Sequence, residues 1–120
     1  MQIQANHHVL AVPDIAESAD FFVRTLGFRE TFNDGNWIFV KRDNCLIMLG
    51  ECPDAIPPRE LGDHQYFAYL VVDDADAFFT RCKAEDAEIT SPIADKPWQM
   101  REFGVRTPDG HRIMIGHDLE

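Results

Sequence analysis

The side chains that stand out as candidates for acid–base chemistry are Glu102 and a few histidines. Glu102 lies in a strand-like stretch, where it could act as a general base or as the counter-charge of a bound cation. A salt bridge to Arg101, Arg106 or Arg112 would explain the same glutamate equally well. The sequence contains no glycine-rich phosphate loop, no nucleophile elbow and no basic patch, so none of these signatures selects a reaction.

The cysteine content and the net charge of the chain restrict its expected compartment and its binding partners. The three cysteines cannot all pair within the chain and none has CxxC spacing, which favours idle thiols in a reducing cytoplasm. The net charge of −10 argues against nucleic acid and anionic membranes as partners. The sequence has no apolar run long enough to span a membrane, and its start, MQIQANHH, lacks the features of a signal peptide. We therefore expect a cytoplasmic protein.

Two stretches of similar plan must position these side chains. Residues 98–117 read as two strands joined by a turn at Pro108, Asp109 and Gly110. Residues 37–50 have the same plan around an Asp-Asn turn, and "RIMIG" in one stretch matches "LIMLG" in the other. This echo predicts that the chain consists of two copies of one unit.

Each half of the chain predicts the same order of elements, β-α-β-β-β, and hence an α+β fold. In the first half, apolar residues at helical spacing predict a helix that Asp14 opens and Gly27 ends. In the second half, Asp73 or Asp74 caps the helix. The expected strands are 7–12, 28–33, 37–42, 45–49, 65–72, 87–90 and the two in 98–117, with 51–63 as linker and 91–97 as loop.

Strand alternation divides the side chains of the hairpins into two rows. Ile38 and Val40, like Phe103 and Val105, form an apolar row suited to packing under a helix. The opposite row carries Trp37 and Phe39 in one copy, and Glu102 and Gly104 in the other. Its more varied chemistry is typical of a cavity wall.

The chain resembles the vicinal oxygen chelate superfamily over nearly its whole length. The residues that carry this resemblance are "HHVLAVPDIAESADFFVRTLGF", "YLVVDDADAFF" and "PWQMREFGVRTPDGHRIMIG". The resemblance implies one domain, 1–120, of two βαβββ modules (1–50 and 64–120) that form an incomplete barrel around a cavity, and a homodimer. The family includes glyoxalase I, extradiol dioxygenases, fosfomycin-modifying transferases and bleomycin-binding resistance proteins, so the fold alone does not choose the function.

Metal-using relatives place one ligand on the first and last strand of each module. Carried over by this resemblance, the four positions are His7, Met48, Phe67 and Met114. Only His7 suits a divalent ion, whereas a catalytic metal normally needs about three protein ligands. His64 lies outside the following strand or on its other face. We therefore expect no metal and no other cofactor.

Aromatic and thioether side chains remain as candidates for a ligand pocket, although such a set is more often plain core. Trp98 follows Pro97, and the resemblance implies that it lines a ligand groove; it could stack on a planar ligand or anchor its loop. We expect a metal-independent protein of the bleomycin-resistance type that sequesters an organic ligand, and the acidic chain favours a cationic one. The alternatives are a metal-dependent lyase, dioxygenase or thiol transferase, and a metal-free enzyme with His7 or Glu102 as base. The predicted ligand-binding residues are His7, Trp37, Phe39, Met48, Phe67, Tyr69, Trp98, Glu102 and Met114.

Overall fold

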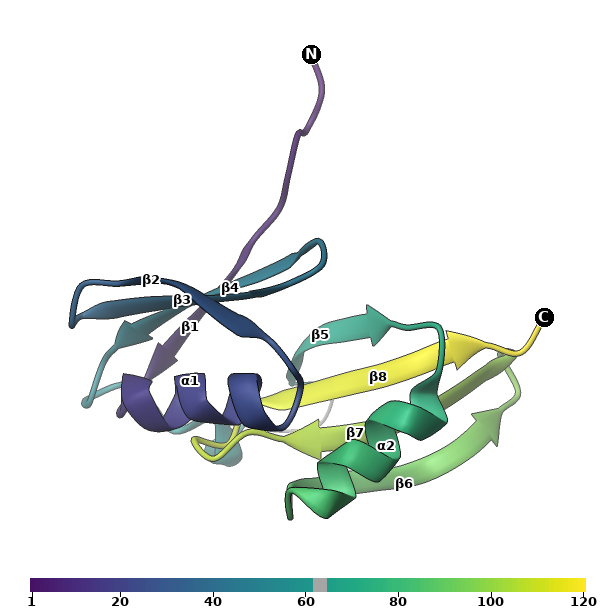
Figure 1. Ribbon diagram of the computed structural model, residues 1–120. Coiled ribbons are helices and arrows are strands. Elements are labelled where there is room, and N and C mark those ends of the chain that lie inside the picture. Colours follow the sequence, from purple (N-terminus) through teal and green to yellow (C-terminus); the bar gives the residue numbers. More distant parts are fainter. Residues whose placement is uncertain (62–64) are drawn as a thin grey trace. The chain divides into compact units, whose positions relative to one another are not determined.

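The computed structural model describes residues 1–61 and 65–120 and divides them into two compact units (Figure 1). Unit one comprises residues 1–56 and unit two residues 57–120. The predicted linker end, the predicted start of the second module and His64 fall on residues 63 and 64, which lie outside the described residues.

Both units contain the predicted βαβββ order, so the α+β fold class is confirmed. Unit one consists of β1 (His8–Val12), α1 (Ile15–Arg24), β2 (Arg29–Asn33), β3 (Trp37–Arg42) and β4 (Cys45–Glu51). Unit two begins with a 3-10 turn, η1 (Pro58–Glu60). Its other elements are β5 (Tyr66–Val71), α2 (Ala75–Ala84), β6 (Glu88–Lys96), β7 (Met100–Arg106) and β8 (Arg112–Asp118).

Each unit has one four-stranded mixed sheet. The strand orders are β1-β4-β3-β2 and β5-β8-β7-β6. The first and last strands of each unit pair in parallel, and the other pairs are antiparallel. A parallel pair needs a long crossover between its strands, and here the helix and the two intervening strands supply it.

In unit one, α1 covers one face of the sheet. Asp14 caps this helix, since its carboxylate accepts from the Glu17 backbone N–H over 3.1 Å. The helix buries a stripe of apolar side chains over the apolar row of β3 and β4. The buried residues are Ile15, Ala19, Phe22, Ile38, Val40, Ile47 and Leu49. Trp37, Phe39 and Met48 alternate with this row and therefore leave the sheet on its other side.

In unit two, α2 covers the sheet in the same way. Asp74, one of the two predicted caps, accepts from the Ala77 backbone N–H over 3.1 Å. The Phe79 ring of α2 lies 5.2 Å from the Phe103 ring, centroid to centroid, and Phe103 and Val105 are fully buried. Glu102 alternates with them and faces away from the helix. We call the face of each sheet opposite its helix the open face.

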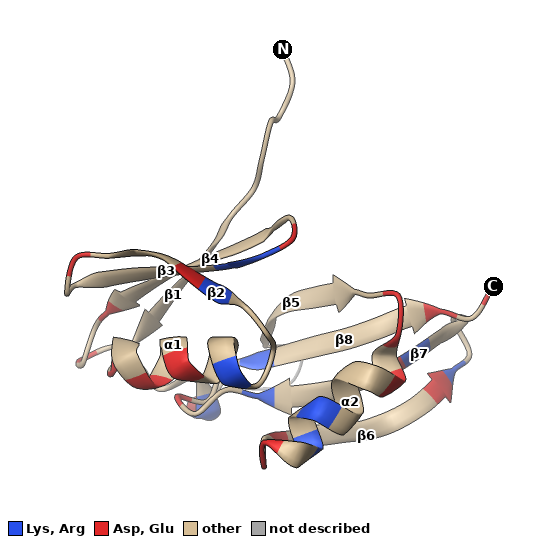
Figure 2. Cartoon of the chain, viewed as in Figure 1, with Lys and Arg blue, Asp and Glu red and all other residues tan. Residues whose placement is uncertain are grey.

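The strand β6 corrects the prediction of a loop at 91–97. This strand continues to Lys96, with register shifts between Ile89 and Ser91 and between Ser91 and Ala94. It tolerates Pro92 because it is an edge strand with irregular pairing, where a missing N–H costs little. Acidic and basic residues are interspersed in both units (Figure 2). No helix among the described residues is long and apolar enough to cross a membrane.

Candidate functional site

Three of the predicted site residues meet on the open face of unit two. The Tyr69 hydroxyl donates to Glu102 Oε1 over 2.9 Å, and the Trp98 indole N–H donates to the same oxygen over 2.7 Å. Glu102 is 5% exposed, whereas Trp98 is 61% exposed. One oxygen of a buried carboxylate therefore fixes both rings, and the Trp98 ring remains accessible to a partner.

The register of the sheet explains how these side chains reach one another. Glu102 of β7 lies opposite Gly116 of β8, and Tyr69 of β5 lies opposite Met114. A Cβ atom on Gly116 would meet the Tyr69 ring carbon Cζ at 3.1 Å and the Glu102 Cβ at 3.0 Å. Glycine at 116 thus lets the Tyr69 ring approach the sheet and reach Glu102. Trp98 comes from the turn between β6 and β7, next to Gln99 with a φ of 63°.

The open face of unit one is aromatic where that of unit two is polar. The Trp37 and Phe39 rings are 6.5 Å apart, and Phe39 lies opposite Met48 in the register of β3 and β4. Phe32 of β2, which was not predicted as a site residue, adds a ring 4.9 Å from that of Phe39. The bulge that turns Phe32 toward this face gave no signal in the sequence.

Of the other predicted residues, Met114 adjoins the group in unit two, whereas His7 and Phe67 lie apart from both groups. His7 precedes β1 rather than lying within it, and is exposed. The Phe67 ring lies 5.9 Å from the His111 imidazole, near the turn that follows β7. Met114 is next to the trio in unit two, with its sulfur 3.1 Å from where a Cβ of Gly104 would lie. The predicted common cavity for all nine residues stays a prediction.

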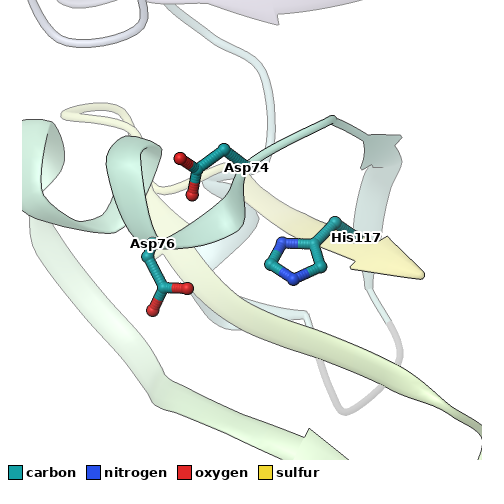
Figure 3. Close-up of side chains that lie close together, drawn as sticks. All are labelled: Asp74, Asp76 and His117. Carbon is teal, nitrogen blue, oxygen red and sulfur yellow. The ribbon is translucent and has the colours of Figure 1, made fainter. Parts of the chain in front are cut away.

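A cluster of Asp74, Asp76 and His117 near the start of α2 has ligand atoms within 4.8 Å of one another (Figure 3). Every member already has a partner. Asp74 caps the helix, His117 Nδ1 accepts from the Ala75 backbone N–H over 2.7 Å, and Asp76 binds Arg101 over 3.0 Å. We read the cluster as part of the N-terminal cap of α2, because these contacts hold the start of the helix and its neighbouring ion pair.

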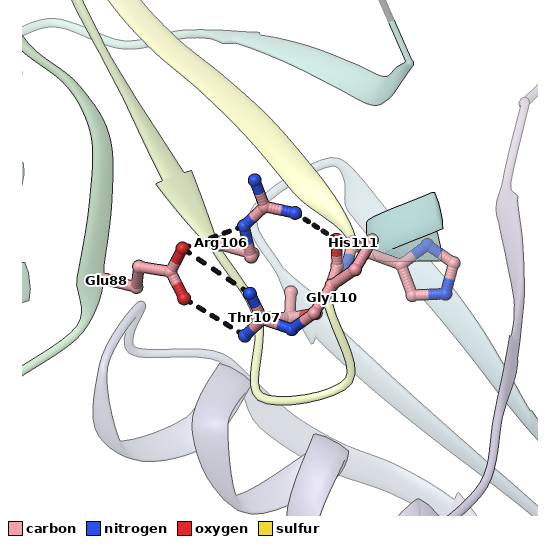
Figure 4. Close-up of polar contacts among 6 residues, drawn as sticks. Glu88, Arg106, Thr107, Gly110 and His111 are labelled. Carbon is pink, nitrogen blue, oxygen red and sulfur yellow. Dashed lines mark hydrogen bonds and ion pairs between the residues drawn. The ribbon is translucent and has the colours of Figure 1, made fainter. Parts of the chain in front are cut away.

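The arginines near Glu102 bind other carboxylates. Arg101 pairs with Asp95 over 2.7 Å as well as with Asp76. Arg106 pairs with Glu88 over 2.9 Å (Figure 4). Glu88 also accepts from Arg59. Among the described residues Glu102 forms no ion pair. The salt bridge considered from the sequence is therefore replaced by hydrogen bonds from two aromatic side chains.

The burial of the site and the hydrogen bond to Glu102 change the pKa of the Tyr69 hydroxyl. Burial raises the pKa of the Tyr69 hydroxyl above its usual range, and the hydrogen bond to Glu102 and the charge of that carboxylate raise it further. Tyr69 therefore keeps its proton and stays a donor to Glu102 at neutral pH. Its hydroxyl thus remains a hydrogen-bond donor to the carboxylate.

The positions that carry metal ligands in metal-using relatives do not fit a divalent ion here. Met48 and Met114 offer thioethers and Phe67 offers no donor, and such ions prefer nitrogen, oxygen or thiolate ligands. His7 is the one donor of suitable chemistry among the four. No catalytic step through a metal follows from these residues.

Comparison with known proteins establishes the family. A model of the Glyoxalase/Bleomycin resistance protein/Dioxygenase superfamily matches residues 4–115, and the chain belongs to this superfamily. The resemblance seen in the sequence is thereby confirmed. No curated protein matches the chain.

Solved structures with the same fold come from several bacteria. TioX from Micromonospora sp. ML1 is 26% identical over 96% of this chain and 100% of its own, with a TM-score of 0.75. The bleomycin resistance determinant encoded on the transposon Tn5 is 22% identical over 97% and 98%, with a TM-score of 0.79. The bleomycin-binding protein of Streptomyces verticillus, solved with copper(II)-bleomycin, is 23% identical over 96% of each chain, with a TM-score of 0.73.

Proposed function

We propose that this protein binds a small organic molecule on the open face of unit two and holds it unchanged, as a sequestering protein. The observation that carries this proposal is the pairing of a buried, doubly hydrogen-bonded Glu102 with an exposed Trp98 ring. An aromatic face beside fixed polar groups is the usual composition of a ligand site. The fold shared with a bleomycin-binding protein and a resistance determinant supports this type of function.

The favoured ligand is planar and carries a donor or a positive charge. Oε1 of Glu102 accepts both aromatic donors, so the carboxylate retains acceptor capacity for a ligand N–H. The Trp98 ring offers a stacking surface, and a cation on Trp contributes roughly 0.5 to 2 kcal/mol. The net charge of −10 also attracts cations at long range.

Fluorescence can test the proposal directly, because the chain has only two tryptophans. In a Trp37→Phe background Trp98 becomes the sole reporter, and a stacked ligand should quench it. Calorimetry with bleomycin and with planar cationic drugs should show that Trp98→Ala weakens binding about two- to thirtyfold. Glu102→Gln should weaken the cationic ligands too, and Trp37→Phe is the matched control.

Two results would overturn the proposal. One is equal affinity in the wild type and in Trp98→Ala for every ligand that binds. The other is chemical conversion of the bound ligand, seen by mass spectrometry, which would favour an enzyme.

The metal content of the purified protein tests the alternative, a metal-dependent enzyme. Because Met48, Phe67 and Met114 stand where relatives carry donors, purified protein should hold no stoichiometric zinc, nickel, manganese or iron. Elemental analysis measures this. About one metal ion per chain, lost in His7→Ala, would favour the metal-dependent lyase, dioxygenase or transferase.

A further inference from the structure

Two cations of unit one face each other across β2 and β3 without a carboxylate between them. Arg29 and Lys41 are directly opposite in the strand register, so their side chains leave the sheet on the same face. Within the described part of the chain, neither side chain takes part in an ion pair. Like charges in this position destabilise a sheet. In a chain with 21 acidic residues, a carboxylate for this pair would be easy to supply.

Lys41 also borders a hollow of about 510 Å³ on the open face of unit one. The β3–β4 hairpin forms one side with Lys41, Asn44 and Leu46. The segment before β1 forms the other side with residues 4–7. The lining thus combines an ammonium group with the amides of Gln4, Asn6 and Asn44 and with His7, and it includes no carboxylate. These groups offer hydrogen-bond donors to an anion.

The hollow continues into apolar surface along the same two strands. Lys41 lies opposite Leu46, and the next pair on this face is Phe39 opposite Met48. Two residues along a strand span about 7 Å, the length of a small fused ring system. The face therefore presents a cationic end and an aromatic and thioether end at a separation that one planar molecule can bridge.

We infer that this hollow is a binding site for the carboxylate of a planar aromatic acid. The ammonium group of Lys41 pairs with the carboxylate, Arg29 adds positive potential, and the ring lies over Phe39 and Met48. A charge-assisted hydrogen bond holds the acid, and a neutral or cationic analogue loses this charge pairing with Lys41. This site is in unit one, shares no residue with Tyr69, Trp98 and Glu102, and does not depend on the function proposed for them.

The test compares naphthoate with naphthamide, which has the same ring system without the charge. Titration calorimetry on the full chain should show that naphthoate binds more tightly, and that Lys41→Met weakens naphthoate about three- to tenfold while leaving naphthamide unchanged. Lys41→Arg should retain most of the affinity, because it keeps the charge. Added salt should weaken naphthoate, since exposed charges are screened.

Lys96→Met is the matched control. Lys96 ends β6 in unit two and makes no ion pair within residues 1–61 and 65–120, so this variant changes the net charge by the same amount as Lys41→Met. Loss of naphthoate binding in Lys96→Met equal to that in Lys41→Met would overturn the site, because it would indicate a general charge effect. Equal affinity for naphthoate and naphthamide, or no binding of naphthoate, would overturn it too. Trp98→Ala should leave naphthoate binding intact, so the two proposals fail separately.

Discussion

At the scale of single residues, the feature with the clearest consequence is the hydrogen bond between Tyr69 and Glu102. Burial and the carboxylate raise the pKa of Tyr69 above the value of about 10 that a free tyrosine has. The unfolded chain therefore releases this proton at lower pH than the folded chain does. The resulting stabilisation is complete below about pH 10 and is lost as the pH rises through the folded pKa.

Alkaline titration can measure this effect on one residue. The chain has two tyrosines, so Tyr66→Phe leaves Tyr69 as the only phenol. The ultraviolet absorbance of the phenolate should develop well above the pH at which it does in urea. Glu102→Gln should lower the pKa of Tyr69, because it removes the charge. Identical titration curves in folded and unfolded protein would contradict this assignment.

At the scale of elements, an ion pair between Arg59 and Glu88 connects η1 to β6. Arg59 Nη2 lies 3.0 Å from Glu88 Oε1, and a Cβ on Gly110 would come within 3.5 Å of the Arg59 Cδ. The hydrogen bond from Arg59, with the charges of Arg59 and Arg106, lowers the pKa of Glu88. The stabilisation is present above the unfolded value of about 4.3 and is lost as the pH falls through the lower folded pKa.

We expect the melting temperature of the wild type to fall more than that of Glu88→Gln between about pH 5 and pH 3. The contribution of Glu88 to the free energy of unfolding should stay below about 1 kcal/mol. The reason is that its side chain is 49% exposed and solvent screens its ion pairs. Glu60→Gln, in η1 itself, is the control. If the melting temperature depended on pH in the same way in all three proteins, the Arg59–Glu88 ion pair would not stabilise the fold.

The caps of the two helices allow a matched comparison. Asp14 and Asp74 each accept one backbone N–H over 3.1 Å, but α2 has a second acceptor in His117. Replacing a capping aspartate by alanine costs about 0.5 to 2 kcal/mol. Asp14→Ala should therefore destabilise the protein more than Asp74→Ala, as measured by urea unfolding. The reverse order would show that His117 does not support the start of α2.

The helices and strands could be predicted where the spacing of apolar residues agrees with the residues that start and end an element. An example is α1, with Asp14 before it and Gly27 after it. The continuation of β6 could not, because Pro92 and the polar residues around it read as a loop and only pairing with β7 makes them a strand. Alternation placed Glu102 on the open face. Its partners could not be predicted, since they depend on the rotamers and register of three separate segments.

At the scale of the whole molecule, the exposed sheet edges predict association. Strands β1, β2, β5 and β6 are edges, and Val9 and Val71 on two of them are 61% and 71% exposed. Unpaired edges with apolar side chains favour pairing with another chain. We therefore expect a two-fold homodimer, the commonest closed symmetry.

Light scattering at micromolar concentration should give twice the mass of 13.7 kDa. Val9→Lys, which puts a charge on an edge strand, should shift the equilibrium toward the monomer, whereas Val23→Lys on α1 should not. A wild type that is monomeric at every concentration would refute the prediction.

Gly50 and Gly116, which end the matching segments "LIMLG" and "RIMIG", restrict how the two halves can diverge in sequence. The Trp37 ring lies over Gly50 in unit one, with its Cη2 2.9 Å from where a Cβ would be, and the Tyr69 ring lies over Gly116 in unit two. A Cβ atom at either position would therefore force the ring above it to move. In divergent descendants, position 116 should become free to vary only after Tyr69 has been replaced by a smaller residue, and position 50 only after Trp37 has. The two halves should thus each carry a pair of positions that change in a fixed order.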